Sequence, residues 1–175
     1  MSALHSPPAL YGYRDGFEEL DPAEANALCV AWDHDLGPCN RPFGMQAWAF
    51  AIDGQRVAVA ISASTVSATL RGSLVDVQWR RDEVVELARL CAANHWANRV
   101  MLRWWREVAA LRWPYWPIRA AVSYSDRGKT GNLYRLDGWR LIADNCGSSG
   151  GGTWTGKRTG NHKGKKLWDW RYPTD

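Results

Sequence analysis

The chain has 175 residues, of which 46% are hydrophobic and 23% are charged, and its formal net charge at pH 7 is +4. This composition indicates one folded globular domain and excludes a disordered chain, which would have too few apolar residues to build a core. No apolar run approaches the roughly 20 residues of a membrane-spanning helix. Residues 1–10 contain no Lys or Arg, so we also expect no signal peptide and a cytoplasmic location.

The cysteines and acidic groups do not predict a metal site. Four cysteines (Cys29, Cys39, Cys91 and Cys146) are widely spaced and form no Cys-x-x-Cys pair. That spacing argues against a zinc ribbon and fits a reducing compartment. The triplet 33–35 (Asp-His-Asp) lacks a second ligand cluster, so we expect no metal ligands, and metal dependence is left open.

In chain order, the first predicted element is a helix that begins at Asp21-Pro22 and fades near residue 32. Asp is a favoured N-cap, and Pro suits the first helical position. The Gly, Pro and Asp content of residues 33–42 predicts a loop. Residues 45–52 and 56–62 predict two strands of a hairpin, because Asp53-Gly54 between them is a strong turn signal.

The second half of the chain predicts a strand-helix-strand crossover. Residues 84–92 favour a central strand, with a helix as the alternative. Residues 98–111 place apolar side chains at three- and four-residue steps and predict the clearest helix. A strand at 118–124, a helix at 130–136, a strand at 139–143 and a last strand at 153–155 follow. This order predicts an α/β fold with a mixed sheet flanked by helices.

A polar cluster at the end of the apolar run 118–122 is the first candidate for a catalytic site. Ser123, Tyr124 and Asp126 close that strand, and Tyr134 lies eight residues beyond Asp126. A carboxylate and a phenol that face one cleft can take a proton from a nucleophile and give one to a leaving group. The alternatives are structural, with Asp126 as a turn residue and the others packed in the strand and helix.

The end of the chain, residues 157–175, is basic and contains tryptophans. Basic groups mixed with aromatic rings can hold a phosphate backbone and stack on bases, and one ring could hold a base flipped out of the duplex. We therefore predict contact with double-stranded DNA, and the alternative is a solubilising tail whose tryptophans dock on the domain. The residues assigned to this contact are Lys157, Arg158, Lys163, Lys165, Lys166, Trp168 and Trp170.

Five short segments carry a family resemblance: Val85-Glu-Leu-Ala-Arg-Leu-Cys91, Asn94 ahead of a helix, Ser123-Tyr-Ser-Asp126, Thr130-Gly-Asn-Leu-Tyr134, and Gly138-Trp139. With them, the chain resembles the GNAT acyltransferase superfamily over residues 20–156, and within it the phage branch that contains the DNA-modification protein Mom. We therefore predict a GNAT-like acyltransferase domain over residues 1–156, followed by the basic, Trp-containing C-terminal segment over 157–175. The resemblance also implies a sheet of six or seven strands with a V-shaped cleft between two parallel strands.

The resemblance further implies roles for individual residues. Tyr134 would protonate a departing CoA thiolate, and Asp126 would act as base or orient the amine. Ser123 and Tyr124 would hold the acyl carbonyl or the amine, and His34 would contact the acceptor. The residues implied for acetyl-CoA or a related acyl-CoA are Leu90, Cys91, Asn94, Trp96, Ala97, Asn98, Arg99 and Arg103. The turn at 92–98 lacks the family's glycines, without which a backbone approaches phosphate less freely.

The function predicted from the sequence is acyl transfer from a CoA thioester to the exocyclic N6 amine of adenine in DNA, a phage anti-restriction modification. One alternative is a GNAT N-acetyltransferase that acts on a small amine, a protein or a tRNA-linked acceptor. Another is a non-catalytic GNAT-like binding module, which the glycine-free turn keeps open. The acyl group and the choice between monomer and homodimer are not determined by the sequence.

Overall fold

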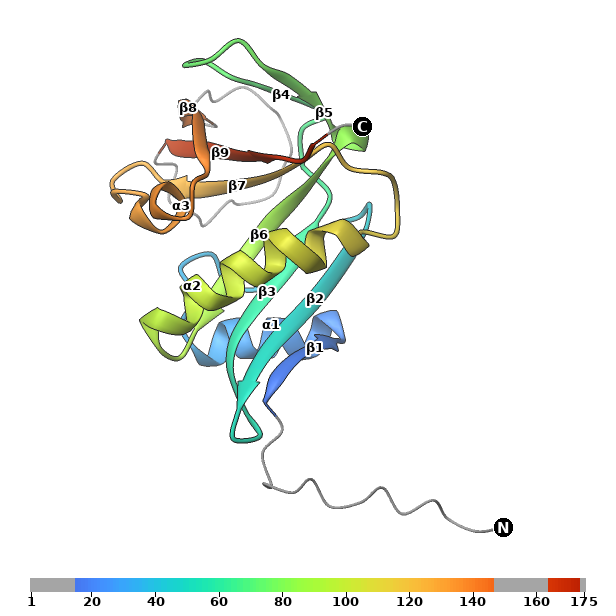
Figure 1. Cartoon of the computed structure of the whole chain (residues 1–175), viewed down its shortest axis with the longest axis vertical. Coiled ribbons are helices and arrows are strands. Elements are labelled where there is room, and N and C mark those ends of the chain that lie inside the picture. Colours follow the sequence, from blue (N-terminus) through green and yellow to red (C-terminus); the bar gives the residue numbers. More distant parts are fainter. Residues whose placement is uncertain (1–14, 147–163, 174–175) are drawn as a thin grey trace, which may run out of the picture.

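The computed structural model describes residues 15–146 and 164–173, which contain one large mixed sheet, a small hairpin and three α-helices (Figure 1). The helices are α1 (Pro22–Ala31), α2 (His95–Trp104) and α3 (Asn132–Leu136), and the hairpin consists of β4 (Thr69–Arg71) and β5 (Gln78–Arg80). The large sheet contains, in spatial order, β1 (Gly16–Leu20), β2 (Met45–Ile52), β3 (Gln55–Ala63), β6 (Val84–Ala92), β7 (Ala120–Asp126), β9 (Lys165–Arg171) and β8 (Arg140–Cys146).

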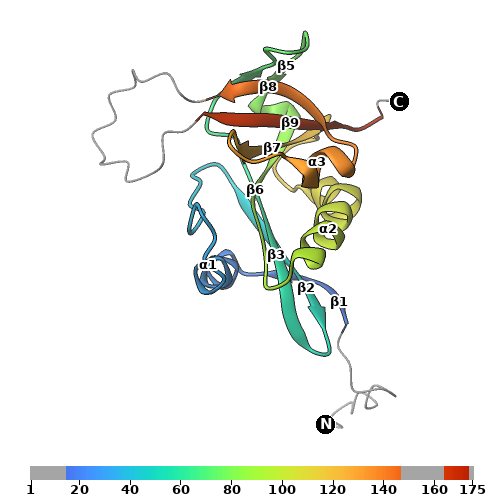
Figure 2. The ribbon, with the colours of Figure 1, turned by 90° about the vertical axis from the view of Figure 1, so that its left-hand side faces the viewer.

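The predicted crossover lies at the centre of this sheet. β6 and β7 pair in parallel, and every other adjacent pair among the described strands is antiparallel. Parallel neighbours need a crossover, which α2 provides here. Figure 2 shows α1 on one face of the sheet and α2 with α3 on the other. The α/β class and the strand alternative for residues 84–92 are therefore confirmed.

Local signals explain the first elements. The Asp21 carboxylate accepts a hydrogen bond from the Ala23 N–H at 2.7 Å, and Pro22 occupies the first helical position, as expected for an N-cap. Asp53 and Gly54 both have positive φ angles, 52° and 73°. Positive φ at both central residues matches the twist of a two-residue β-hairpin, so the predicted β2–β3 turn is confirmed.

Each face of the sheet has its own core. On the face of α2, Val85 and Leu87 pack with Met101, Trp105 and Trp168. On the face of α1, Cys29 packs with Val59, Ile61 and Cys91. The β4–β5 hairpin covers the other half of that second face, where Trp79 lies over a cluster that includes Val122, Ile142 and Leu167. No described helix is long and apolar enough to span a membrane.

A buried carboxylate ties the hairpin to the sheet. Asp169 on β9 is 1% exposed and accepts hydrogen bonds from Arg140 Nε and Nη2, at 2.9 and 2.6 Å. The Trp79 indole N–H donates to it at 3.1 Å, and Arg171 lies 3.6 Å away. Since a buried charge needs several partners, this network fixes the hairpin on β9.

Several predicted boundaries were wrong. The helix predicted at 98–111 begins at His95 and changes to a π-helix at Trp105–Ala109 and a 3-10 helix at Ala110–Arg112. β1 and the β4–β5 hairpin were not predicted, and the strand predicted at 139–143 runs over Arg140–Cys146. The last described strand is β9 at Lys165–Arg171, within the segment expected to lie apart from the domain, while residues 153–155 lie outside the described residues.

Candidate active site

The pairing between β6 and β7 ends before either strand does. Their ladder joins four residue pairs, from Val84–Ala120 to Leu87–Ser123. β6 nevertheless continues to Ala92 and β7 to Asp126, and β7 stays paired with β9 throughout. On its other side, β6 has a bulge at residue 88, since Ser62 pairs with Leu87 while Ile61 pairs with Arg89. Bulges bend a strand and re-aim its backbone, so the parallel strands separate after Leu87 and Ser123.

A chain of two hydroxyl groups marks the point of separation. Tyr134 Oη lies 2.8 Å from Ser123 Oγ, and Ser123 Oγ lies 3.0 Å from the Leu87 carbonyl oxygen. A serine hydroxyl has one proton, and a carbonyl can only accept. Ser123 therefore donates to Leu87, and Tyr134 donates to Ser123. Two predicted site residues, Ser123 and Tyr134, are thus in direct contact where β6 and β7 part.

The Tyr134 ring is held on the α2 face of the sheet. It is 8% exposed, stacks on Trp168 with ring centroids 5.6 Å apart, and meets the edge of Trp139 at 5.4 Å. Burial raises the pKa of its phenol, and the hydrogen bond with Ser123 opposes that rise. The phenol is therefore protonated at neutral pH, as a general acid must be before it acts.

Asp126 and Tyr134 do not face each other. Successive side chains of a strand point to opposite faces, so Asp126 shares the face of Val122 and Tyr124, away from Ser123. The Asp126 carboxylate accepts a hydrogen bond from the Gly128 N–H at 2.7 Å and caps the turn after β7. Tyr124, another predicted site residue, lies on the same face as Asp126. Burial raises the pKa of its phenol, and the charge of Glu86 raises it further. The pairing of Asp126 with Tyr134 in one cleft was therefore wrong, because an eight-residue separation does not fix the face of either side chain.

Glu86 is a buried carboxylate at the separation that was not among the predicted site residues. It lies on β6 one residue before the last ladder pair and is 3% exposed. Arg41 Nη2 donates to Glu86 Oε1 at 2.9 Å, while Glu86 Oε2 is buried without a partner among the described residues. Burial raises the pKa of Glu86, and Arg41, Arg89 and Lys165 oppose that rise. Its carboxylate in the middle of an apolar strand was the available sequence signal.

The loop after α1, residues 33–44, reaches this face and is held by Arg89. The Arg89 guanidinium donates to the carbonyl oxygens of Leu36, Gly37 and Pro38, at 3.2, 2.7 and 3.0 Å. His34, predicted to contact the acceptor, is half-buried, and its Nδ1 accepts from the Leu36 N–H at 3.1 Å. Burial and then Arg89 lower the pKa of His34, and the Leu90 backbone at the end of β6 opposes them. His34 therefore lies beside the unpaired end of β6, on the loop that also carries Arg41.

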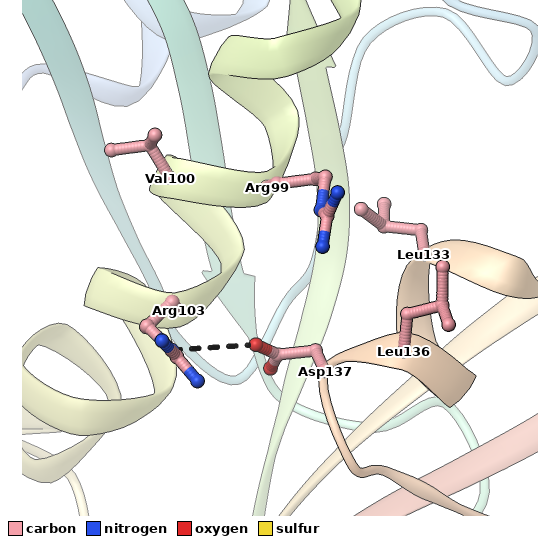
Figure 3. A pocket seen from close by; sticks show the side chains of 6 residues that line it. All are labelled: Arg99, Val100, Arg103, Leu133, Leu136 and Asp137. Carbon is pink, nitrogen blue, oxygen red and sulfur yellow. Dashed lines mark ion pairs between the residues drawn. The ribbon is translucent and has the colours of Figure 1, made fainter.

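A groove of about 230 Å³ opens between α2 and α3 on the Tyr134 side of the sheet. Figure 3 shows its walls, where Arg99 and Arg103 of α2 face Leu133 and Leu136 of α3. Asp137 lies at its edge, 3.7 Å from Arg103 Nε, and is also paired with the buried Arg106 at 2.6 Å. Glu107 also pairs with Arg103 and Arg106, at 3.8 and 3.0 Å. Three arginines, including Arg99, therefore face two carboxylates, and the groove keeps a positive balance.

The N-terminus of α2 lies about one helical turn before Arg99, which lines this groove. Its N-cap Asn94 makes no side-chain capping bond, and the first turn holds no acidic residue. Uncapped helical N–H groups and the helix dipole both favour an anion. This geometry fits the phosphates of a CoA thioester despite the absence of glycine.

The other residues predicted to bind the donor lie around that helix end. Trp96 is 50% exposed and packs edge-on against Phe50, while Ala97 is buried in the core and could offer only its backbone. Asn98 is half-buried with Oδ1 unpartnered among the described residues, and Leu90 packs on the α2 face. Cys91 is different, because its side chain lies in the core on the α1 face. The prediction that the Cys91 side chain contacts the acyl-CoA donor was therefore wrong, because the alternation of side chains along β6 points this side chain away from the groove.

The residues predicted to bind DNA do not form one exposed surface. Lys157, Arg158 and Lys163 lie outside the described residues. Lys165 and Lys166 are half-buried at the start of β9. Trp168 is 4% exposed and donates to Ser125 Oγ at 2.9 Å, and Trp170 lies under the Arg106 guanidinium at 3.8 Å. Trp168 is therefore too buried to stack on a base, and one face of the half-buried Trp170 ring is already covered by Arg106.

Several solved structures have a similar fold, and two of the following three are acetyltransferases. A GNAT family acetyltransferase from Elizabethkingia anophelis with acetyl-CoA bound has a TM-score of 0.52 at 10% identity, over 90% of this chain and 97% of that one. NAA60 from Arabidopsis thaliana, in complex with a bisubstrate analogue, has a TM-score of 0.57 at 11% identity, over 90% and 99%. The aminoglycoside 6'-N-acetyltransferase from Enterococcus faecium has a TM-score of 0.56 at 10% identity, over 91% and 99%.

These matches show that the chain has the GNAT acetyltransferase fold, as the sequence resemblance implied. No protein-family model matches the sequence, and no curated protein is significantly similar to it. The matches give no support to the phage branch that contains Mom. Because sequence identity is near 10%, the structural similarity establishes the fold alone. The acceptor has to be inferred from the residues of the site.

Proposed function

We propose that this chain is an N-acyltransferase that moves an acyl group from a CoA thioester to a primary aliphatic amine. The main support is the end of the β6–β7 ladder at Leu87 and Ser123, where Tyr134 donates to Ser123. At that point a buried phenol lies on one face of the sheet and a buried carboxylate, Glu86, on the other. A thioester between the two strands would therefore have an acid on one side and a base on the other.

The roles of the two groups follow from their charges. Glu86 takes a proton from the amine, whose nitrogen attacks the thioester carbon and forms the new C–N bond. The C–S bond breaks, and Tyr134 turns its O–H from Ser123 to the departing sulfur. The raised pKa of Tyr134 keeps this proton in place until it is needed. Backbone N–H groups at the bulge of β6 are the candidate donors for the transient oxyanion.

The groove between α2 and α3 is the proposed site for the nucleotide end of the donor. Arg99 and Arg103 supply positive charge, while Val100, Leu133 and Leu136 supply apolar surface. That combination suits an adenosine with phosphate groups, because guanidinium groups bind phosphate through charged hydrogen bonds. The uncapped end of α2 would accept the pyrophosphate.

We place an aliphatic amine ahead of the adenine amine of DNA as the acceptor. The DNA prediction rested in part on stacking by Trp168 and Trp170, and both rings are occupied within the protein. An adenine amine is a poor nucleophile, since its lone pair is delocalised, so it would need strong positioning. Lys165 and Lys166 still offer charge for a phosphate backbone. Mass analysis of nucleosides from duplex DNA treated with the protein and acetyl-CoA tests this second acceptor.

Calorimetry with acetyl-CoA tests the proposal directly. We expect saturable binding that weakens about tenfold or more when Arg99 and Arg103 are both changed to Gln, because two charged phosphate contacts are lost. Arg112→Gln is the matched control, since Arg112 follows the same helical segment but lies over Trp48. A panel of primary amines, followed by thiol release, then tests transfer. Absence of binding at roughly millimolar acetyl-CoA would reject the enzyme in favour of a non-catalytic module.

A further inference from the structure

The face of the sheet opposite Tyr134 carries an incomplete polar cluster around Glu86. This cluster consists of Glu86, Arg41 and Lys165, which come from β6, the loop 33–44 and β9. Glu86 Oε1 is bound by Arg41, but Glu86 Oε2 is buried and has no partner within the described part of the chain. A buried carboxylate oxygen without a donor costs free energy. Its position indicates a ligand group with an N–H to offer.

The two cations of the cluster also have donors to spare. Among the described residues, the Arg41 guanidinium donates to Glu86 and also acts on the Cys39 thiol, which uses only part of its five N–H donors. Lys165 forms no ion pair with any described residue, although it lies close enough to lower the pKa of Glu86. Asp126 is opposite Lys165 in the β7–β9 ladder, but its carboxylate caps the turn at Gly128.

The charge on this face therefore exceeds what Glu86 can balance. Arg41, Arg89 and Lys165 all act on that one carboxylate. Arg89 makes its hydrogen bonds to carbonyl oxygens alone, so its positive charge is not neutralised. When Asp126 is counted with Glu86, these groups carry three positive charges and two negative charges. This excess of positive charge would repel a simple cationic amine, whereas it would attract an amine that also carries a negative charge.

We propose that the acceptor is a primary amine that carries a carboxylate close to the nitrogen, as an amino acid does. Its nitrogen binds Glu86 Oε2, and its carboxylate lies between Arg41 and Lys165. This inference rests on the proposed function, because it names the acceptor of the same acyl transfer. It explains why a base needed for catalysis is surrounded by cations, and why one of its oxygens has no donor within the protein.

Pairs of acceptors that differ only in the carboxylate test the inference. We expect kcat/KM for L-phenylalanine to exceed that for phenethylamine, and L-lysine to exceed cadaverine, by about tenfold to a hundredfold, the effect of one or two charge-assisted hydrogen bonds. Lys165→Gln should reduce this ratio towards one. Lys166→Gln is the matched control, since its Nζ donates to the Lys129 carbonyl instead, and it should keep the ratio.

Calorimetry with acetyl-CoA on the same preparations separates the two levels of the argument. If acetyl-CoA binds and both members of each pair react equally, or neither reacts, the inference is overturned and the donor site stands. Acylation of adenine in a duplex oligonucleotide in place of amino acids would overturn it as well. If acetyl-CoA does not bind, the proposed function fails and the inference fails with it.

Discussion

Tyr134 is buried and Tyr172 is half-buried, and the two tyrosines differ in their position relative to the proposed chemistry. Tyr134 Oη donates to Ser123 Oγ at 2.8 Å, where β6 and β7 separate. Tyr172 Oη donates to the Arg106 carbonyl oxygen at 2.7 Å, away from that point. Replacing either tyrosine with Phe removes one hydroxyl and keeps the ring. The pair therefore separates loss of a proton donor from loss of a hydrogen bond.

The two variants should lose similar stability. Each deletes one intramolecular hydrogen bond and leaves its partner, Ser123 or the Arg106 carbonyl, with one contact fewer, which costs about 1 kcal/mol. For a chain of this size that is a fall in Tm of roughly 2–4 °C. Their rates should differ, because loss of a general acid costs about 10²- to 10⁴-fold, or roughly 3–5 kcal/mol of barrier.

Thiol release from acetyl-CoA in the presence of a reactive amine measures the rate, and thermal unfolding measures the stability. We expect Tyr134→Phe to lose at least a hundredfold in kcat with acetyl-CoA binding retained, and Tyr172→Phe to stay within about twofold. A Tyr134→Phe variant that turns over at the normal rate would refute the acid assignment. Equal losses in both variants would refute it too, since they would point to a general effect of the deleted bonds.

Three further predictions concern buried charges. Burial raises the pKa of Glu86, so wild-type stability should fall as pH rises through that pKa, because the unfolded chain then binds fewer protons than the folded one; Glu86→Gln cannot ionise there and should lack this fall and lose acyl transfer. Parallel stability curves for the two proteins between about pH 4 and 8 would contradict this. Asp169→Asn should cost about 3 kcal/mol in urea unfolding, because Arg140 and Trp79 lose a buried acceptor, whereas Asp144→Asn, which weakens a surface pair with Arg127, should cost less than about 1 kcal/mol. Similar values for both would reject the buried network. Arg89→Met should speed amide hydrogen exchange in loop 33–44 roughly tenfold, because three carbonyl contacts are lost, while Arg56→Met, which breaks a surface pair with Glu18, should leave that loop unchanged; unchanged exchange in Arg89→Met would show that other contacts hold the loop.

Local patterns predicted the elements whose signals lie within a few residues. Asp21-Pro22 started α1, and Asp53-Gly54 turned the β2–β3 hairpin, because capping and positive φ are properties of those residues themselves. The strand-helix-strand order around β6 and β7 was also readable, since buried runs and helical periods repeat over a few residues. The position of β9 was not readable, because a strand inserted between β7 and β8 is specified by partners 19 or more residues away, the shortest separation being that of Cys146 and Lys165.

The site was predicted in part for the same reason. Ser123 and Tyr134 were found because they lie close in sequence on a strand and the helix that follows it. The other predictions failed because the sequence did not show to which face of the sheet each side chain points. Asp126 and Cys91 point to the α1 face, and Trp168 is buried on the α2 face. A one-residue difference in register moves a side chain from one face to the other, and the sequence does not show register.

By itself, the sequence determined the α/β order, the turn and cap residues, and a strand that ends in a serine, a tyrosine and an aspartate. Only the tertiary structure decided that β6 and β7 stop pairing at Leu87 and Ser123, that Tyr134 and Glu86 lie on opposite faces there, and that Arg41 and Lys165 gather around Glu86. The physical reason is the separation along the chain over which each interaction acts. Capping and hydrophobic period act between neighbours in the chain, whereas strand register and the balance of buried charges depend on residues brought together only by folding.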